Sequence, residues 1–191
     1  MVLPEPFTTA SPSLVNYDFT DIANGTGYET YYLIVAEDNT GKTYHLTPHK
    51  DYSAAAILSV ISSTEDHDYD LSPFTIPRTI NGDVTVSLAA HGGAATYTAV
   101  VEIYRYDGTT ETKLGDTVTF AKLMTGAGDM WYFRIPIANE IIPAGQQLRA
   151  RVSYGIAGAT AGGLGVDPAG RTNASFITTT SKISVPYKLD A

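Results

Sequence analysis

The chain contains no cysteine among its 191 residues. Disulfide bridges, thiolate metal sites and cysteine nucleophiles are therefore excluded together. Charged residues are also scarce, at 17%, and basic ones are the scarcer kind, since 12 Lys and Arg stand against 20 Asp and Glu. A formal net charge of −8 does not suit the phosphates of nucleic acids or anionic membranes. We expect neither nucleic acid nor a membrane as a partner.

Long hydrophobic runs are missing as well. No stretch approaches the ~18 apolar residues that a membrane span needs. Residues 1–13 have neither a basic start nor an apolar run, so they do not resemble a secretory signal. We therefore predict that the chain folds in a reducing cytoplasm. The proline-punctuated residues 1–13 are predicted to be an N-terminal contact segment, and residues 14–191 a single domain.

Apolar and polar residues alternate with a period of two along much of the chain, which is typical of antiparallel strands with one solvated face. We expect such strands over residues 83–90, 96–106, 131–137, 146–156 and 182–190. Asp107-Gly108 between two of these runs is a strong hairpin signal. Asn24-Gly25, Asn39-Thr40-Gly41 and Asn81-Gly82 mark further turns.

Short strands at turn spacings of about 8 to 12 residues predict an all-β fold, a single antiparallel β-sandwich of jelly-roll-like type. Residues 53–63 combine an alanine run with Ile and Val, and they fit a short helix or a strand equally well. The predicted core consists of the inward-facing residues Val84, Val86, Val101, Ile103, Trp131, Phe133, Leu148, Val152, Ile183 and Val185.

Two segments interrupt the strand pattern. Residues 63–78 are acidic and bounded by proline, and Asp66, Asp68 and Asp70 alternate as at the start of a calcium-binding loop. A hand-type loop would need Gly and Glu where Leu71 and Pro77 stand, so that motif is absent. An improvised calcium site at residues 65–70 and a solvated loop both stay open. Residues 155–174 are rich in glycine and lack the Lys-Ser/Thr ending of a phosphate-binding loop, which favours a flexible loop.

His45 and His49 are four residues apart, a spacing that brings two metal ligands together only when the chain is helical. Pro48 lies between His45 and His49 and disfavours helix. In an extended chain the two residues would lie about 13 Å apart, too far to share one ion. We interpret them as surface histidines, and we predict no metal-ligating residue and no cofactor.

Catalytic motifs are also missing from the sequence. There is no Gly-x-Ser-x-Gly motif of a serine hydrolase. Glu102 and Glu140 are the kind of acids that a glycosidase pairs, but solvated or ion-paired carboxylates explain them as well. Arg149 and Arg151 share one strand face, where we expect ion pairs with nearby acids. We predict no catalytic residue and a protein that is not an enzyme.

Tyrosine is the exception to this sparse chemistry, with 13 residues against 6 Phe and 1 Trp. Residues 16–38 join an Asn-Gly-Thr-Gly turn to a tyrosine-rich strand, which predicts a hairpin that displays tyrosine side chains. Tyrosine suits sheet surfaces in general. It is also enriched where proteins bind other proteins, and it stacks on sugars. Both interpretations stay open at this point.

Three segments carry a family resemblance: YDFTDIANGTGYETYYL (residues 17–33), IPAGQQLRARVSYG (142–155) and KISVPYKLD (182–190). In style they resemble virion structural proteins of tailed phages, small acidic β-sandwich proteins without cysteine that decorate capsids. The resemblance implies a place on the virion, assembly in the host cytoplasm and a major capsid protein as partner. It transfers no functional residue.

The sequence therefore predicts a non-catalytic virion protein that decorates or cements a capsid, with the major capsid protein and copies of itself as partners. The glycine-rich residues 155–170 and residues 1–13 are the predicted contact elements. The alternative is a carbohydrate-binding or receptor-binding β-sandwich module, for which a glycan would be the ligand. A capsid protein needs an extended contact face, whereas a glycan binder needs exposed aromatic side chains that converge.

Overall fold

The computed structural model describes residues 26–38, 41–50, 58–59, 66–125, 128–155, 162–167 and 180–188, and every regular element among them is a strand. The strands are β1 (Thr26–Asp38), β2 (Gly41–Thr47), β3 (Leu58–Ser59), β4 (His67–Asp70), β5 (Arg78–His91), β6 (Thr96–Tyr106), β7 (Glu111–Leu123), β8 (Gly128–Ile142), β9 (Gln147–Gly155), β10 (Gly163–Gly165) and β11 (Lys182–Lys188). The predicted all-β class is thus confirmed. The described part of the chain has no helix long and apolar enough to span a membrane.

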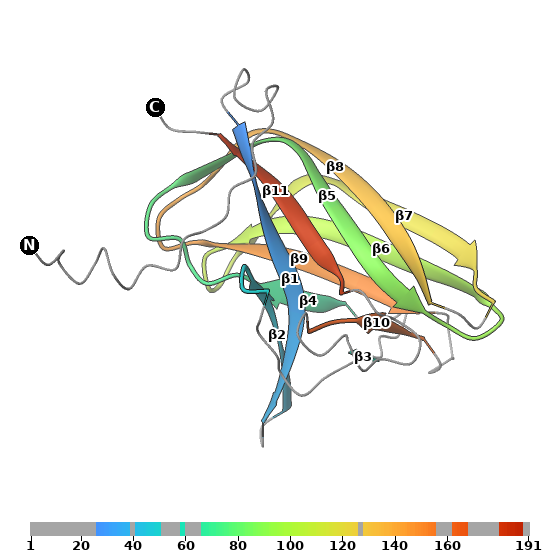
Figure 1. Cartoon of the computed structure of the whole chain (residues 1–191). Helices are drawn as coiled ribbons and strands as arrows, with labels where there is room; N and C mark the ends of the chain where they lie inside the picture. Colours follow the sequence, from blue (N-terminus) through green and yellow to red (C-terminus); the bar gives the residue numbers. More distant parts are fainter. Residues whose placement is uncertain are drawn as a thin grey trace, which may run out of the picture.

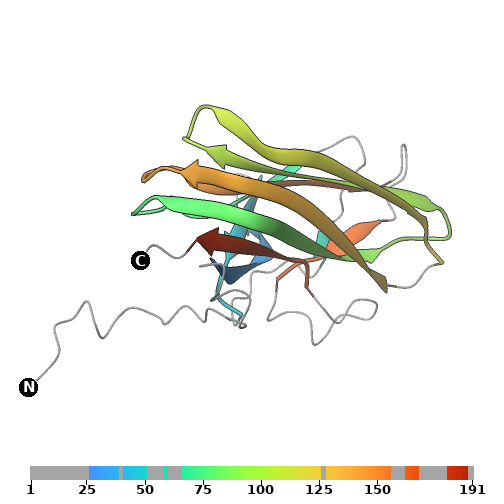
Figure 2. The same cartoon turned by 90° about the horizontal axis from the view of Figure 1, so that it is seen from above.

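The strands pair into one continuous sheet in the order β3-β10-β5-β11-β1-β2-β4-β9-β6-β7, and β8 pairs with β5 beside this path. All pairings are antiparallel except that of β2 with β4. The sheet curls, so that β1, β11, β5 and β8 lie in front of β6, β7 and β9 (Figures 1 and 2). The predicted sandwich is therefore not confirmed, because its two faces belong to one curled sheet rather than to two separate sheets.

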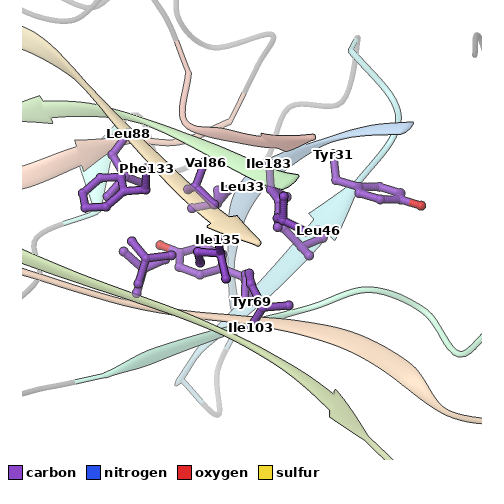
Figure 3. Packing of buried hydrophobic residues seen from close by; sticks show 14 of the residues in the cluster. Tyr31, Leu33, Leu46, Tyr69, Val86, Leu88, Ile103, Phe133, Ile135 and Ile183 are labelled. Atoms are coloured by element: carbon purple, nitrogen blue, oxygen red, sulfur yellow. The ribbon is translucent and has the colours of Figure 1, made fainter. Parts of the chain in front are cut away.

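The interior of the curl holds the hydrophobic core. All ten core residues predicted from the alternation are buried, each at 3% exposure or less. Figure 3 shows Val86, Phe133 and Ile183 from one side of the curl and Tyr69 and Ile103 from the other, gathered in this interior. Burial of this apolar surface is the main source of stability, at roughly 25 cal/mol for each Å².

The turns are partly as predicted. Residues 107–110 connect β6 to β7, and the Asp107 carboxylate accepts hydrogen bonds from the backbone N–H groups of Thr109 and Thr110 at 2.9 and 2.7 Å. β1 and β2 pair from Asp38 opposite Gly41, so the chain reverses at the predicted place. Asn81-Gly82 is not a turn before a strand. Gly82, at a φ of 135°, lies inside β5 where the pairing with β8 shifts, which is the place of a β-bulge.

The segment predicted to be an acidic loop contains a strand. His67–Asp70 forms β4 and pairs with β9, because Tyr69 is fully buried while Asp68 and Asp70 face the other way. The ambiguous residues 53–63 include the strand Leu58–Ser59, paired with β10. The predicted contact segment 1–13, residues 16–25 of the predicted hairpin and most of the glycine-rich stretch 155–174 lie outside the described residues.

The tyrosines of the chain are divided between the core and the surface. Tyr31, predicted to be displayed, is 3% exposed, because its side chain points from β1 into the core, whereas Tyr32 on the opposite face of the strand is half-buried. Tyr97 and Tyr154 stack in the core with their ring centroids 5.4 Å apart. Tyr132 on β8 is 74% exposed. Only part of the tyrosine content therefore supplies contact surface.

Candidate functional site

The outer surface of the curled sheet carries two groups of polar side chains, one on each side of the molecule. The first lies on β4, β9, β6 and β7. The strand register sets Asp68 beside Arg151 and Asp70 beside Arg149. Because side chains of paired residues point to the same face, all four project outward together. Glu111 of β7 completes this group, which we call the ion-pair network: Asp68, Asp70, Glu111, Arg149 and Arg151.

The two guanidinium groups in the network are held by two bidentate ion pairs. Arg149 donates to both carboxylate oxygens of Asp70 at 2.6 and 2.7 Å. Arg151 binds Asp68 in the same manner at 2.6 and 3.0 Å. Glu111 bridges the two arginines, with Oε1 accepting from both at 2.5 and 2.7 Å. The expected local ion pairs of Arg149 and Arg151 are thus confirmed.

Tyrosine rings lie against both guanidinium groups. The Arg149 guanidinium carbon is 3.7 Å from the ring centroid of Tyr106, and that of Arg151 is 4.7 Å from Tyr104. Each contact is a cation–π interaction, which adds to the attraction of the carboxylates. The hydrogen bonds that Arg149 donates to Asp70, and Arg151 to Asp68, raise the pKa of each guanidinium despite its partial burial. The arginines are therefore locked to their own strands.

The ion pairs of Asp68 and Asp70 bear on the hypothesis of an improvised calcium site at residues 65–70, because they use two of its carboxylates. Asp68 and Asp70 direct their carboxylates at arginine side chains rather than toward a common cation position. Among the described residues, no group of three or more His, Asp and Glu side chains is placed to hold a metal ion. On β2, His45 Nε2 forms a hydrogen bond with the Thr43 hydroxyl at 3.0 Å, and His49 lies just after the end of that strand.

Glu102 and Glu140, considered as a pair of glycosidase acids, lie on different strands, β6 and β8. Burial raises the pKa of Glu102, but hydrogen bonds from Lys113, Thr117 and Tyr104 outweigh it and lower the pKa from 4.5 to about 2. Lys113 Nζ and the Tyr104 hydroxyl each lie 2.7 Å from the carboxylate. A carboxyl group held ionised in this way does not suit the general acid of a glycosidase.

We expect replacement of Glu102 by Gln to remove a pH-dependent part of the stability. The folded pKa lies below the unfolded one, so this contribution is present above pH 4.5 and is lost as the pH falls toward 2. Because the site is at the surface, we expect Glu102→Gln to cost about 1 kcal/mol at neutral pH. Urea unfolding at neutral pH and near pH 3 should show this difference shrink in acid. A difference that stays constant over that range would contradict the assignment.

The second polar surface lies on the outer side of β8, β5, β11 and β1. The registers place Tyr132, Ser87, Lys182 and Tyr32 in one row, and Arg134, Thr85, Ser184 and Thr30 in the next. Tyr28 lies two residues before Thr30 on the same face. We call this surface the tyrosine face: Tyr28, Thr30, Tyr32, Asp83, Thr85, Ser87, Tyr132, Arg134, Lys182 and Ser184.

Small hydroxyl side chains occupy the middle of the tyrosine face, and tyrosines occupy its two margins. The hydroxyls of Thr30 and Ser184 lie 2.9 Å apart. Tyr132 is the most exposed large side chain on this face, while Tyr28 and Tyr32 are half-buried. Arg134 pairs with Asp83 at 2.5 Å. The charged residues of this face are Asp83, Arg134 and Lys182, and the ring of Tyr132 protrudes from it.

The two surfaces differ in what they offer a partner. The ion-pair network binds its own groups and stiffens the sheet, so a ligand would have to break existing bonds. The tyrosine face presents three Tyr residues and one Arg, which are residue types enriched at protein interfaces. The alternation of residues 131–137 predicted which side chains of β8 point outward, but only the pairing of β8, β5, β11 and β1 brings these residues together.

Comparison with known proteins gives relationships of fold and none of sequence. No family model and no curated protein sequence matches the chain. An alpha-amino acid ester hydrolase matches with a TM-score of 0.63 and 13% identity, over 84% of this chain and 36% of the hydrolase. A CocE/NonD family hydrolase from Staphylococcus aureus gives a TM-score of 0.54 with 10% identity, over 85% of this chain and 35% of its own length.

An aminopeptidase from a marine sediment archaeon, Thaumarchaeota archaeon, matches with a TM-score of 0.50 and 12% identity, over 81% of this chain and 32% of its own length. These likenesses contradict the prediction that the chain is not an enzyme, because the fold occurs in hydrolases. The chain spans about a third of the length of each of these proteins. At such identities the likeness shows the fold alone.

A more distant likeness joins this chain to a viral shell protein. The VP2 subviral particle of infectious bursal disease virus matches with a TM-score of 0.35 and 15% identity, over 86% of this chain and 38% of that protein. The likeness is too distant to carry an argument about function. No relationship of sequence or family connects the chain to a tailed-phage decoration protein.

Proposed function

We propose that this chain is a structural domain that binds a protein partner through its tyrosine face. The observation that carries the proposal is the arrangement of that face, where exposed Tyr132 and Arg134 border a middle of Ser and Thr. Tyr and Arg are the residues that most often dominate the energy of protein interfaces. Small neighbours let a partner approach the sheet closely around them.

The particular partner that we propose is the major capsid protein of a virus shell. Support comes from the sequence resemblance to tailed-phage virion proteins, together with an acidic chain free of cysteine, which suits assembly in a host cytoplasm. We also propose that the curled sheet is of jelly-roll-like type, with β8, β5, β11 and β1 on the side that meets the shell. Residues 1–13 and 155–170 are proposed as additional contacts.

Replacement of Tyr132 by alanine tests this proposal. We expect Tyr132→Ala to weaken attachment to purified particles about tenfold or more, as loss of an interface hot spot does. Co-sedimentation of the purified chain with particles from the host culture would measure it. The matched control is Ile76→Ala, which removes a 58% exposed side chain that is not one of the tyrosine-face residues and should leave attachment unchanged.

Two outcomes would contradict the capsid proposal. Unchanged attachment of the Tyr132→Ala variant would show that the tyrosine face is not the contact. If the chain has no affinity for particles but binds a glycan, and Tyr132→Ala abolishes that binding, the carbohydrate-binding alternative takes its place.

A second candidate function is suggested by the match to about a third of the length of hydrolases. In that case the chain would be the β-domain of a hydrolase, and the tyrosine face would contact a catalytic domain. Reproducible turnover of an amino-acid ester or a peptide by this chain with its partner would favour this candidate. Stoichiometric incorporation into virus particles would favour the first.

A further inference from the structure

The curled sheet ends in an unusually exposed edge strand. Within the described residues, β7 pairs only with β6. From residue 115 to residue 123 every side chain except Val118 is exposed, including Phe120 at 43% and Leu123 at 62%. An edge strand carries a row of unpaired backbone N–H and C=O groups that can pair with another chain.

β8 does not close this edge. The two strands approach each other at Gly115, where an added Cβ would lie 2.8 Å from Ile135 Cγ2 and 3.0 Å from the Pro136 carbonyl oxygen. Farther along, the contact is made by side chains, with the Phe120 and Trp131 ring centroids 5.0 Å apart. Among the strands that the structure describes, no pairing joins β7 and β8, so in this part of the chain the outer backbone groups of residues 117–121 are left for another partner.

The sequence of this edge favours pairing rather than protection. Natural edge strands are usually guarded by Pro, by inward charges or by bulges. Here the pairing of β7 with β6 has a bulge over residues 115–117, which includes Asp116 and where Gly115 has a φ of 73°, and the pairing is regular from Val118 to Leu123. The five residues that follow Asp116 are Thr-Val-Thr-Phe-Ala, which are uncharged and contain no proline, and Lys122 then ends the run.

This segment is complementary to itself. If two copies pair antiparallel about a two-fold axis at Thr119, Val118 of each lies opposite Phe120 of the other. Asp116 of each copy then lies opposite Lys122 of the other, so two attractive charge pairs flank an apolar centre. Lys122 also pairs with Asp129 of its own chain, which holds the ammonium group at this edge.

Charge also favours this register over a shifted register of the same two strands. Moving the two-fold axis from Thr119 to Asp116, three residues toward the start of β7, would place Asp116 of one copy opposite Asp116 of the other. Like charges directly opposite each other destabilise a strand pair. Because the same surface serves both copies, the two-fold contact closes on itself and does not extend into a fibre.

We propose that two copies of this chain pair edge to edge through residues 115–123 of β7, with their sheets continuous across a two-fold axis at Thr119. This contact is made by β7, which carries no residue of the tyrosine face, and it can be tested on the purified chain without particles. A dimer would present two tyrosine faces to a larger assembly.

The test is a charge exchange followed by analytical ultracentrifugation. The full chain is expected to form dimers as its concentration rises. Asp116→Lys sets like charges opposite each other twice, and Lys122→Asp does the same, so each should weaken dimerisation about tenfold or more. The double variant restores both pairs and should recover dimerisation. Thr112→Lys, exposed on β7 outside the paired segment, is the control that should not change it.

Three results would overturn the proposal: a wild-type chain that stays monomeric, single variants that dimerise normally, or a double variant that does not recover. Since Lys122→Asp also removes the ion pair with Asp129, circular dichroism should show that each variant is folded. The Asp116→Lys variant leaves that ion pair intact, so its loss of dimerisation reports on the edge contact alone.

Discussion

Replacement of Phe133 by alanine is expected to lower the free energy of unfolding by about 3–5 kcal/mol, the usual loss for a buried aromatic side chain. Phe133 lies on the inner face of β8 and is 3% exposed. Its ring packs against Phe120 with centroids 6.3 Å apart, beside Val86 of the neighbouring strand. The substitution leaves a cavity between the two sides of the curled sheet.

Tyr132 provides a matched control for this substitution. It is adjacent to Phe133 on the same strand but points outward and is 74% exposed. Tyr132→Ala should therefore change the free energy of unfolding by less than about 1 kcal/mol. Urea titration of both variants, with the slope of the transition unchanged, gives the comparison. Equal losses would show that the face assigned to β8 is wrong.

Removal of Arg149 is expected to be the most costly change on the outer surface. Arg149→Met should lower the free energy of unfolding by about 3 kcal/mol, near the low end for breaking a buried ion pair. The reason is that Asp68, Asp70 and Glu111 all bind this guanidinium, whose side chain is 11% exposed. Without it, three carboxylates share a single arginine.

Two variants of similar chemistry separate this effect from a general loss of charge. Arg134→Met removes an exposed guanidinium with one carboxylate partner and should cost much less than Arg149→Met, since exposed ion pairs contribute little to stability. Arg149→Lys keeps the charge but loses the planar fork that binds Asp70 through two hydrogen bonds, so it should recover less than half of the loss. If Arg149→Met and Arg134→Met cost the same, the network does not stabilise the sheet.

The sequence predicted the local features of this fold well, because local patterns cause them. The alternation of apolar residues in β5 and β8 reflects the two faces of a strand, so it identified Val84, Val86 and Phe133 as core. Asp107-Gly108 predicted its turn because Gly108 adopts a φ of 95°, which other residues rarely do.

Features that depend on distant pairing could not be predicted in the same way. β4 is four residues long and acidic, and it becomes a strand only because β9, about 80 residues later, supplies Arg149 and Arg151 on the same face. The curl of the sheet has the same origin. It depends on the pairing of β1 with β11 and on the parallel contact of β2 with β4, neither of which has a local signal.

The candidate site illustrates both cases. The outward direction of Tyr132 and Arg134 follows from the alternation in β8, but their neighbours Ser87 and Thr30 come from β5 and β1. The tyrosine content alone did not distinguish Tyr31, which packs in the core, from Tyr132, which is exposed. That difference follows from the position of each residue on its strand and the position of the strand in the sheet.

We propose above all that this chain is a structural component of a virus shell, which it contacts through the tyrosine face. The most direct measurement is quantitative mass spectrometry of purified, washed particles, comparing the copy number of this chain with that of the major capsid protein. We predict a fixed ratio near a simple stoichiometry, and a chain lost from particles assembled with the Tyr132→Ala variant. Absence of the chain from washed particles, or a trace amount that varies between preparations, would contradict the claim.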